Sequence, residues 1–81
     1  MKNELNIHEI IDMNAVLNQD IYPELYEMVE HGDTIYEDNL WDLIVEHTID
    51  YDLWDETDDV WWFEIFVPMV KCIKEDFTVV D

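Results

Sequence analysis

The fold is decided by one apolar stretch in the second half of the chain, Val60-Trp61-Trp62-Phe63-Glu64-Ile65-Phe66-Val67-Pro68-Met69-Val70. The stretch is apolar nearly all round, which is typical of the most buried element of a small domain. Its Val, Trp and Phe side chains also favour strands, so 60–70 stays open between helix and buried strand. The length of the run and its continuation to Asp76 favour a helix over 57–75, kinked at Pro68.

Upstream of this stretch, apolar side chains recur three and four residues apart. This spacing predicts a first helix over 4–17, with Asn3 as a possible N-cap. Pro23 is suited to the first turn of a helix and Gly32 to a C-terminal stop, which predicts a second helix over 23–31.

A third helix is expected over 35–51, where Asp33 or Thr34 can provide the N-cap. The last residues, 77–81, suit either a frayed tail or a short edge strand. With one glycine and two prolines, the chain has few of the residues that favour turns. The sequence therefore predicts an all-α fold, a small bundle of about four helices in a single domain spanning 1–81.

The charge of the chain is extreme and unevenly placed. Among 81 residues there are 22 Asp and Glu against three Lys and no Arg, a formal net charge of -19. No basic residue occurs from Asn3 to Val70, although 19 of the carboxylates lie there. An apolar fraction of 49% argues against disorder. Local ion pairs cannot explain the acids, so the charge points to a basic partner.

The acids form a pattern on the predicted helices. The 20–30 ridge comprises Asp20, Glu24, Glu27 and Glu30, and the 38–50 ridge comprises Asp38, Asp42, Glu46 and Asp50. Between the third and fourth helices lies the 52–59 cluster, which comprises Asp52, Asp55, Glu56, Asp58 and Asp59. We expect these side chains to bind the partner.

Like charges four residues apart destabilise a helix by roughly 0.2 to 0.5 kcal/mol per pair. A sequence selected only for folding would place lysines between them. Adjacent carboxylates on a ridge lie about 5 to 6 Å apart at Cβ, comparable in scale with the roughly 3.4 Å rise per phosphate of one nucleic-acid strand. Each ridge could therefore imitate a phosphate backbone, whereas the simpler alternative is a solvated helix face.

Other site chemistry is poorly supported. A calcium loop starting at Asp50 fails, because its sixth position is Asp55 instead of glycine and its twelfth is Trp61. His8 and Asp12 lie one helical turn apart, but the second histidine of a zinc helix is missing. Cys72 lies in an apolar context that suits a core residue better than a nucleophile. We therefore expect no catalytic residues, no metal site and no cofactor.

The aromatic side chains are numerous for so small a core. Most are expected to be buried, and a share could form a homodimer or partner interface, for which we select Trp54, Trp61 and Trp62.

Two segments resemble the phage DNA-mimic antirestriction proteins of the overcome-classical-restriction family. They are Asn39-Leu40-Trp41-Asp42-Leu43-Ile44, like that family's acidic helix start, and 61–69, like its aromatic-aromatic-x-acid-Ile-Phe-x-x-Met stretch. The chain is shorter than that family, and where the family has a long acidic tail this chain has Lys71, Lys74 and the uncharged run Phe77-Thr78-Val79-Val80. The resemblance implies an all-helical, dimeric decoy of DNA.

The sequence thus favours a non-enzymatic inhibitor that occupies the nucleic-acid-binding site of a host defence enzyme, either a restriction complex or a CRISPR effector. The expected partner is a basic DNA-binding protein in the host cytoplasm, with no direct nucleic-acid or membrane binding and a possible homodimer. The alternatives are an immunity or antitoxin protein that caps a basic toxin, and an acidic adaptor. The target, the oligomeric state and the match to duplex geometry stay open.

Overall fold

A computed structural model describes residues 6–81, which form a mainly helical bundle. The elements are α1 (Ile7–Ile10), α2 (Met13–Val16), the π-helical turn η1 (Leu17–Ile21), α3 (Tyr22–Glu30), β1 (Ile35–Tyr36), α4 (Glu37–Thr48), α5 (Asp59–Trp61), the π-helical turn η2 (Trp62–Phe66), α6 (Val67–Asp76) and β2 (Val79–Val80). Because α2, η1 and α3 are continuous, they are called the 13–30 helix. Likewise, α5, η2 and α6 form the 59–76 helix. The all-α prediction is confirmed.

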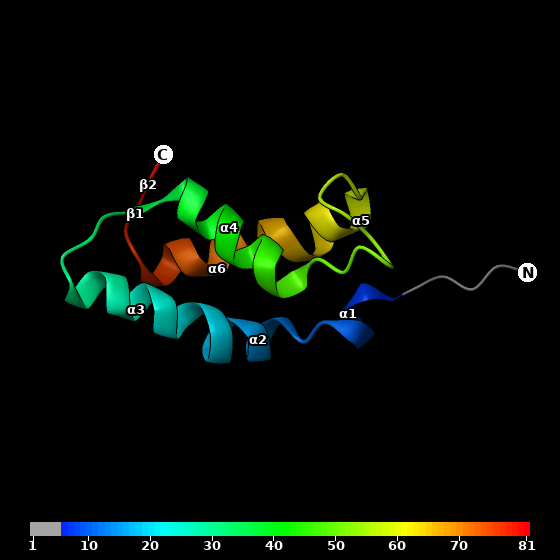
Figure 1. Ribbon diagram of the computed structural model, residues 1–81, viewed down its shortest axis with the longest axis horizontal. Helices are drawn as coiled ribbons and strands as arrows, with labels where there is room; N and C mark the ends of the chain where they lie inside the picture. Colours follow the sequence, from blue (N-terminus) through cyan, green and yellow to red (C-terminus); the bar gives the residue numbers. More distant parts are fainter. Residues whose placement is uncertain (1–5) are drawn as a thin grey trace, which may run out of the picture.

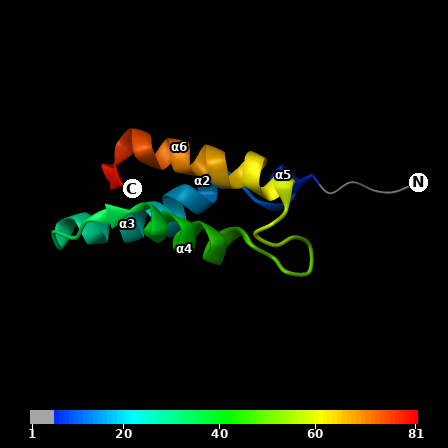
Figure 2. The same cartoon turned by 90° about the horizontal axis from the view of Figure 1, so that it is seen from above.

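The three long helices pack along one another. Figure 1 shows the 13–30 helix below α4 and the 59–76 helix, and Figure 2, turned by 90°, shows α4 and α6 side by side. β1 pairs in parallel with β2, Ile35 opposite Val79, and joins the start of α4 to the C-terminal end. α1 and the loop that follows α4 both lie at the opposite end of the molecule (Figure 1).

The prediction of one helix over 4–17 is wrong. Asn3 and the predicted start of that helix lie outside the described residues. Within it, Ile11 and Asp12 have extended backbone conformations, and Asp12 Oδ1 accepts a hydrogen bond from the Ala15 N–H at 3.1 Å. Asp12 is therefore the N-cap of a new helix, and the chain turns there because a capping carboxylate satisfies an otherwise unpaired N–H.

The predicted boundary before Pro23 is also wrong, because the helix runs through it. A π-helical turn precedes Pro23, and another precedes Pro68 at the same offset. In each case the residue before the proline donates its N–H to the carbonyl five residues earlier, Tyr22 to Leu17 and Val67 to Trp62. A proline lacks the N–H and its ring crowds the carbonyl four residues back, so a wider turn accommodates it within a continuous helix. At Pro68, where the sequence predicts a kink, the helix contains this π-helical turn.

Gly32 ends the 13–30 helix as the sequence predicts. Its φ is +76°, a conformation that glycine adopts without steric cost. The Asp33 N–H donates to the Met28 carbonyl at 2.8 Å and the Gly32 N–H to the Val29 carbonyl at 3.0 Å, which completes a Schellman motif.

The third helix begins later than predicted and ends earlier, at Glu37 and Thr48. Neither Asp33 nor Thr34 caps it. Tyr36 is the N-cap, and its N–H donates to Asn39 Oδ1 at 2.8 Å. The chain before Tyr36 is extended because it pairs with β2, which moves the helix start downstream.

The stretch 60–70 is helical, which resolves the alternative of a buried strand. Asp58 Oδ1 caps this helix by accepting from the N–H groups of Val60 at 2.8 Å and Trp61 at 3.2 Å. The tail forms a short strand, because Val79 and Val80 pair with β1.

The core lies where the three long helices meet. Every fourth residue of the 59–76 helix is buried, namely Trp61, Ile65, Met69 and Ile73. From α4 come Leu40, Ile44 and Thr48, and from the 13–30 helix come Leu17, Ile21 and Leu25. Two indoles meet at the one buried polar residue of the described chain, Thr48: Trp61 Nε1 donates to its Oγ1 at 2.8 Å, and Trp54 Nε1 donates to its carbonyl at 2.9 Å.

Candidate partner-binding surface

The 38–50 ridge lies on the solvent side of α4. Asp38, Asp42 and Glu46 are exposed, on the helix face opposite the buried Leu40 and Ile44. The two ion pairs of the described residues, His8–Glu64 and Lys74–Glu37, involve none of the three. These carboxylates are therefore held by a rigid helix and point away from the core without a basic neighbour inside the described part of the molecule.

Asp50 does not belong to this ridge, which corrects the sequence prediction. α4 ends at Thr48, and Asp50 starts a tight turn in which its carbonyl accepts from the N–H groups of Leu53 and Trp54, both at 2.8 Å. Its Oδ1 accepts from the Asp52 N–H at 3.0 Å. The carboxylate of Asp50 therefore stabilises the loop.

The 20–30 ridge lies on a single helix, since no break separates Asp20 from Glu24. All four carboxylates of this ridge are exposed. Asp20 belongs to η1 and the other three to α3. The 13–30 helix thus presents this ridge on one continuous rod, where the sequence predicted that Asp20 precedes the helix.

The 52–59 cluster has a mixed role. Asp55 Oδ1 accepts from the Thr57 hydroxyl at 2.6 Å and the Thr57 N–H at 2.9 Å, and these bonds hold the pKa of Asp55 below its ordinary value. Asp58 is half-buried because it caps the 59–76 helix. Asp52 and Asp59 are exposed. Two of the predicted binding carboxylates therefore also determine the local fold.

Glu56 and Asp58 are half-buried, whereas the other acids of the 52–59 cluster are exposed. A hydrogen bond with Glu56 raises the pKa of Tyr51 above its ordinary value. Glu56 Oε1 is shielded and has no hydrogen-bond partner among the described residues.

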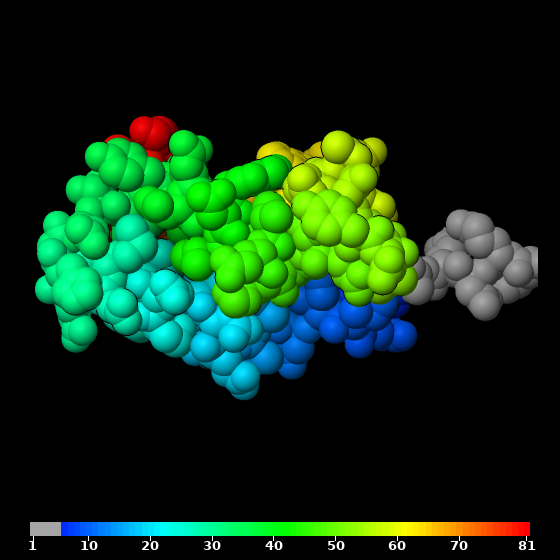
Figure 3. Space-filling model, viewed as in Figure 1, coloured from blue at the N-terminus to red at the C-terminus, as the bar shows by residue number. Residues whose placement is uncertain are grey.

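The elements that carry the three acidic segments are visible together from one side of the molecule. Figure 3 shows α4 in green at its centre, the 13–30 helix below it and the loop of the 52–59 cluster beside it. The described lysines, Lys71 and Lys74, both lie on α6. Lys74 pairs with Glu37; this hydrogen bond lowers the pKa of Glu37 and raises the pKa of Lys74. Of these two lysines, Lys74 is therefore paired with a carboxylate at the start of α4.

The predicted interface of Trp54, Trp61 and Trp62 is wrong for two of its members. Trp54 is 7% exposed and Trp61 is fully buried, so neither offers a surface to a partner. Both are drawn inward by Thr48, which accepts their indole N–H groups. Trp62 is 37% exposed, and its ring stacks on Phe66 at 4.7 Å between centroids.

An exposed apolar stripe on the 59–76 helix was missed by sequence reasoning. It consists of Val60, Phe63 and Val67, of which Phe63 is 65% exposed. The signal was available in the spacing: these positions are out of phase with the buried set that starts at Trp61. A helix that is apolar nearly all round is therefore only half covered.

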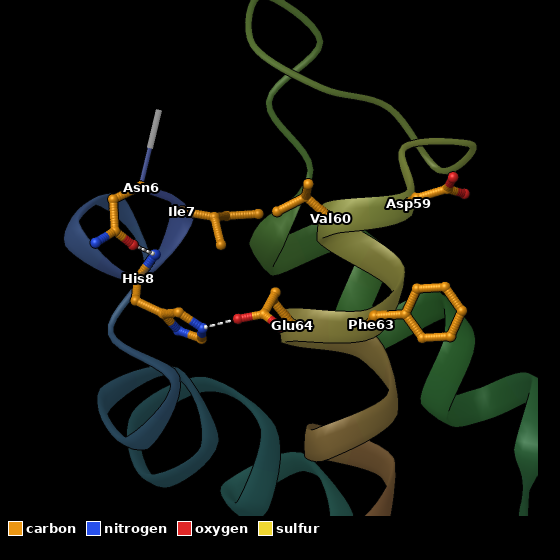
Figure 4. A pocket seen from close by; sticks show the side chains of 7 residues that line it. All are labelled: Asn6, Ile7, His8, Asp59, Val60, Phe63 and Glu64. Carbon is orange, nitrogen blue, oxygen red and sulfur yellow. Dashed lines mark hydrogen bonds and ion pairs between the residues drawn. The ribbon is translucent and has the colours of Figure 1, made fainter. Parts of the chain in front are cut away.

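A groove of about 590 Å³ lies beside this stripe, between α1 and the start of the 59–76 helix. Figure 4 shows His8 and Glu64 pointing toward each other across it, with Nε2 and Oε1 3.0 Å apart. His8, part of the zinc-like spacing in the sequence, thus pairs with Glu64 and ties α1 to the bundle. In the part of the chain from residue 6 onward, no group of three or more His, Cys, Asp or Glu is placed to hold a metal ion.

Cys72 is exposed on α6, which corrects the expectation of a buried residue. No helix within 6–81 has the length and apolar character needed to cross a bilayer. Comparisons with protein-family models, with curated proteins and with solved structures find no match for this chain.

Proposed function

We propose that this protein is a DNA-mimic inhibitor, which acts without catalysis by occupying the nucleic-acid-binding site of a host defence enzyme in the host cytoplasm. The observation that carries the proposal is the pair of exposed ridges on two rigid helices, Asp38, Asp42 and Glu46 on α4 and Asp20 to Glu30 on the 13–30 helix, none of them in an ion pair within the described residues.

Successive carboxylates of α4 rise about 6 Å along the helix axis, since four residues separate them at about 1.5 Å each. Lysine and arginine side chains that bind phosphates can reach carboxylates at such intervals, because both side chains are long and flexible. A net charge of -19 also steers the protein toward a basic channel and makes association fast.

A second candidate is an immunity or antitoxin protein that caps one basic toxin. The exposed stripe of Val60, Phe63 and Val67 favours it, because an apolar patch beside acids suits one shape-specific partner. The two candidates differ in promiscuity. A mimic should bind several unrelated DNA-binding enzymes and be displaced by duplex DNA, whereas a capping protein should bind one toxin.

The test measures binding to a type I restriction complex and to a CRISPR effector, with duplex DNA as competitor and with increasing NaCl. We expect DNA to displace the protein and affinity to fall steeply with salt. The double variant Asp42→Lys/Glu46→Lys should bind at least about tenfold more weakly.

The matched control is Glu9→Lys/Glu75→Lys, which changes the net charge equally at exposed positions that belong neither to the two ridges nor to the 52–59 cluster. It should retain most of the affinity. Equal losses of affinity in both variants would mean that the target responds only to the net charge of the protein and not to the position of its carboxylates. Binding that ignores salt and DNA would refute mimicry.

A further inference from the structure

A second groove lies at the end of the bundle where α3, β1 and β2 meet, at the left of Figure 1. Its volume is about 590 Å³, and it is formed by segments far apart in sequence, 26–35 and 76–80. The Schellman turn at Gly32 and the pairing of β1 with β2 bring these segments together. The groove is thus built by the fold and lies away from the 52–59 cluster.

One wall of this groove is aromatic. Tyr26 is 57% exposed, and its ring centroid lies 5.0 Å from that of the buried Phe77 and 6.4 Å from that of Tyr22. The two neighbouring rings support Tyr26 from the inside. The exposed part of the Tyr26 ring is therefore a fixed surface on which a flat group can lie.

The same groove carries two carboxylates, Asp33 and Asp76. Asp76 is held in place by the Tyr22 hydroxyl, which donates to its Oδ2 at 3.0 Å. Both acids are exposed. Val29, Ile35 and Val80 supply the apolar part of the lining.

We propose that this groove binds an arginine side chain of the basic partner, with the guanidinium over Tyr26 and its N–H groups directed to Asp33 and Asp76. Arginine fits better than lysine, because its planar, weakly hydrated head stacks on aromatic rings and offers several donors at once. Its methylene stem can lie along the apolar lining. The inference rests on the proposed function in that the partner is basic.

The experiment is an amide NMR titration of the full chain with three capped tripeptides, Gly-Arg-Gly, Gly-Lys-Gly and Gly-citrulline-Gly. Citrulline has the shape of arginine without its charge. We expect the arginine peptide to shift the signals of Gly32, Thr34 and Thr78, with weaker effects from lysine and none from citrulline.

The variant Asp33→Asn/Asp76→Asn should bind the arginine peptide roughly 2- to 30-fold more weakly, from two exposed ion pairs. The side-chain amide introduced at position 76 can still accept from the Tyr22 hydroxyl through its oxygen, so the fold is retained. The control Asp38→Asn/Asp42→Asn removes two charges from α4 and should change the affinity less than about twofold.

The arginine site would be refuted if the arginine peptide shifted signals along the two ridges instead of those around the groove. It would also be refuted if both double variants lost the same affinity for this peptide, or if the citrulline peptide bound as well as the arginine peptide. The proposed function is tested separately, by measuring binding to the restriction complex and to the CRISPR effector. If those bind through α4 while the peptide ignores the groove, only this inference fails. If the peptide occupies the groove while no DNA-binding enzyme binds, the proposed function fails and the arginine site stands.

Discussion

Replacing Thr48 with valine tests the polar centre of the core. The variant keeps the shape of the side chain and removes the hydroxyl that accepts from Trp61 Nε1 at 2.8 Å. Trp61 is fully buried, so its indole N–H would lose its partner with no access to water. The bond from Trp54 Nε1 to the Thr48 carbonyl is unaffected, because that acceptor belongs to the backbone.

The expected cost follows from this geometry. A buried donor left without an acceptor costs about 1 to 3 kcal/mol. For a domain of this size, each kcal/mol lowers the melting temperature by roughly 4 to 8 °C. Urea unfolding followed by tryptophan fluorescence should therefore show a lower midpoint with an unchanged m-value.

A double-mutant cycle isolates the hydrogen bond. In a Trp61→Phe background there is no indole N–H to satisfy, so Thr48→Val should cost at least about 1 kcal/mol less than in the wild type. If Thr48→Val were as stable as the wild type, or if its cost were the same in both backgrounds, the indole–hydroxyl bond would not be the polar centre of this core.

Three further predictions concern caps, pH and salt. Asp58→Ala should destabilise the protein by about 1 kcal/mol in urea unfolding, because it removes the N-cap of the 59–76 helix, whereas the exposed Asp52→Ala should have little effect. Burial and the hydrogen bond to Asp76 raise the pKa of Tyr22 from 10.0 to about 12, so the stability it contributes is present below pH 10 and lost as pH rises toward 12. Wild type should therefore lose more stability over that interval than Tyr22→Phe, and equal losses would contradict the assignment. Raising NaCl from low concentration to about 1 M, where the Debye length is about 3 Å, should raise the melting temperature by screening the ridges, and a fall would argue against carboxylate repulsion.

Much of the helical character was predictable because its causes are local. The apolar spacing in 35–51 and the length of the apolar run in 57–75 favour two of the long helices, and Gly32 identifies a helix end. The exposure of Asp38, Asp42 and Glu46 follows from the same periodicity, since residues opposite an apolar face point to solvent.

The helix boundaries were less predictable, because they depend on competing local choices. Asp12 can lie within a helix or cap one, and Pro23 can begin a helix or continue one through a π-helical turn. Packing of Ile7 and Ile11 on one side and of Leu17 on the other favours the observed arrangement.

The sequence by itself determined the helical class, the shortage of basic residues and the exposure of Asp38, Asp42 and Glu46, because periodicity and composition are properties of the chain. Only the tertiary structure decided which aromatic residues are covered. Trp61 and Phe63 lie two residues apart in one apolar run, yet one is fully buried and the other is 65% exposed. Only the tertiary structure joined Tyr26 and Asp33 to Asp76 in one groove. In both cases the physical reason is that burial and proximity depend on elements distant in sequence, which local spacing does not encode.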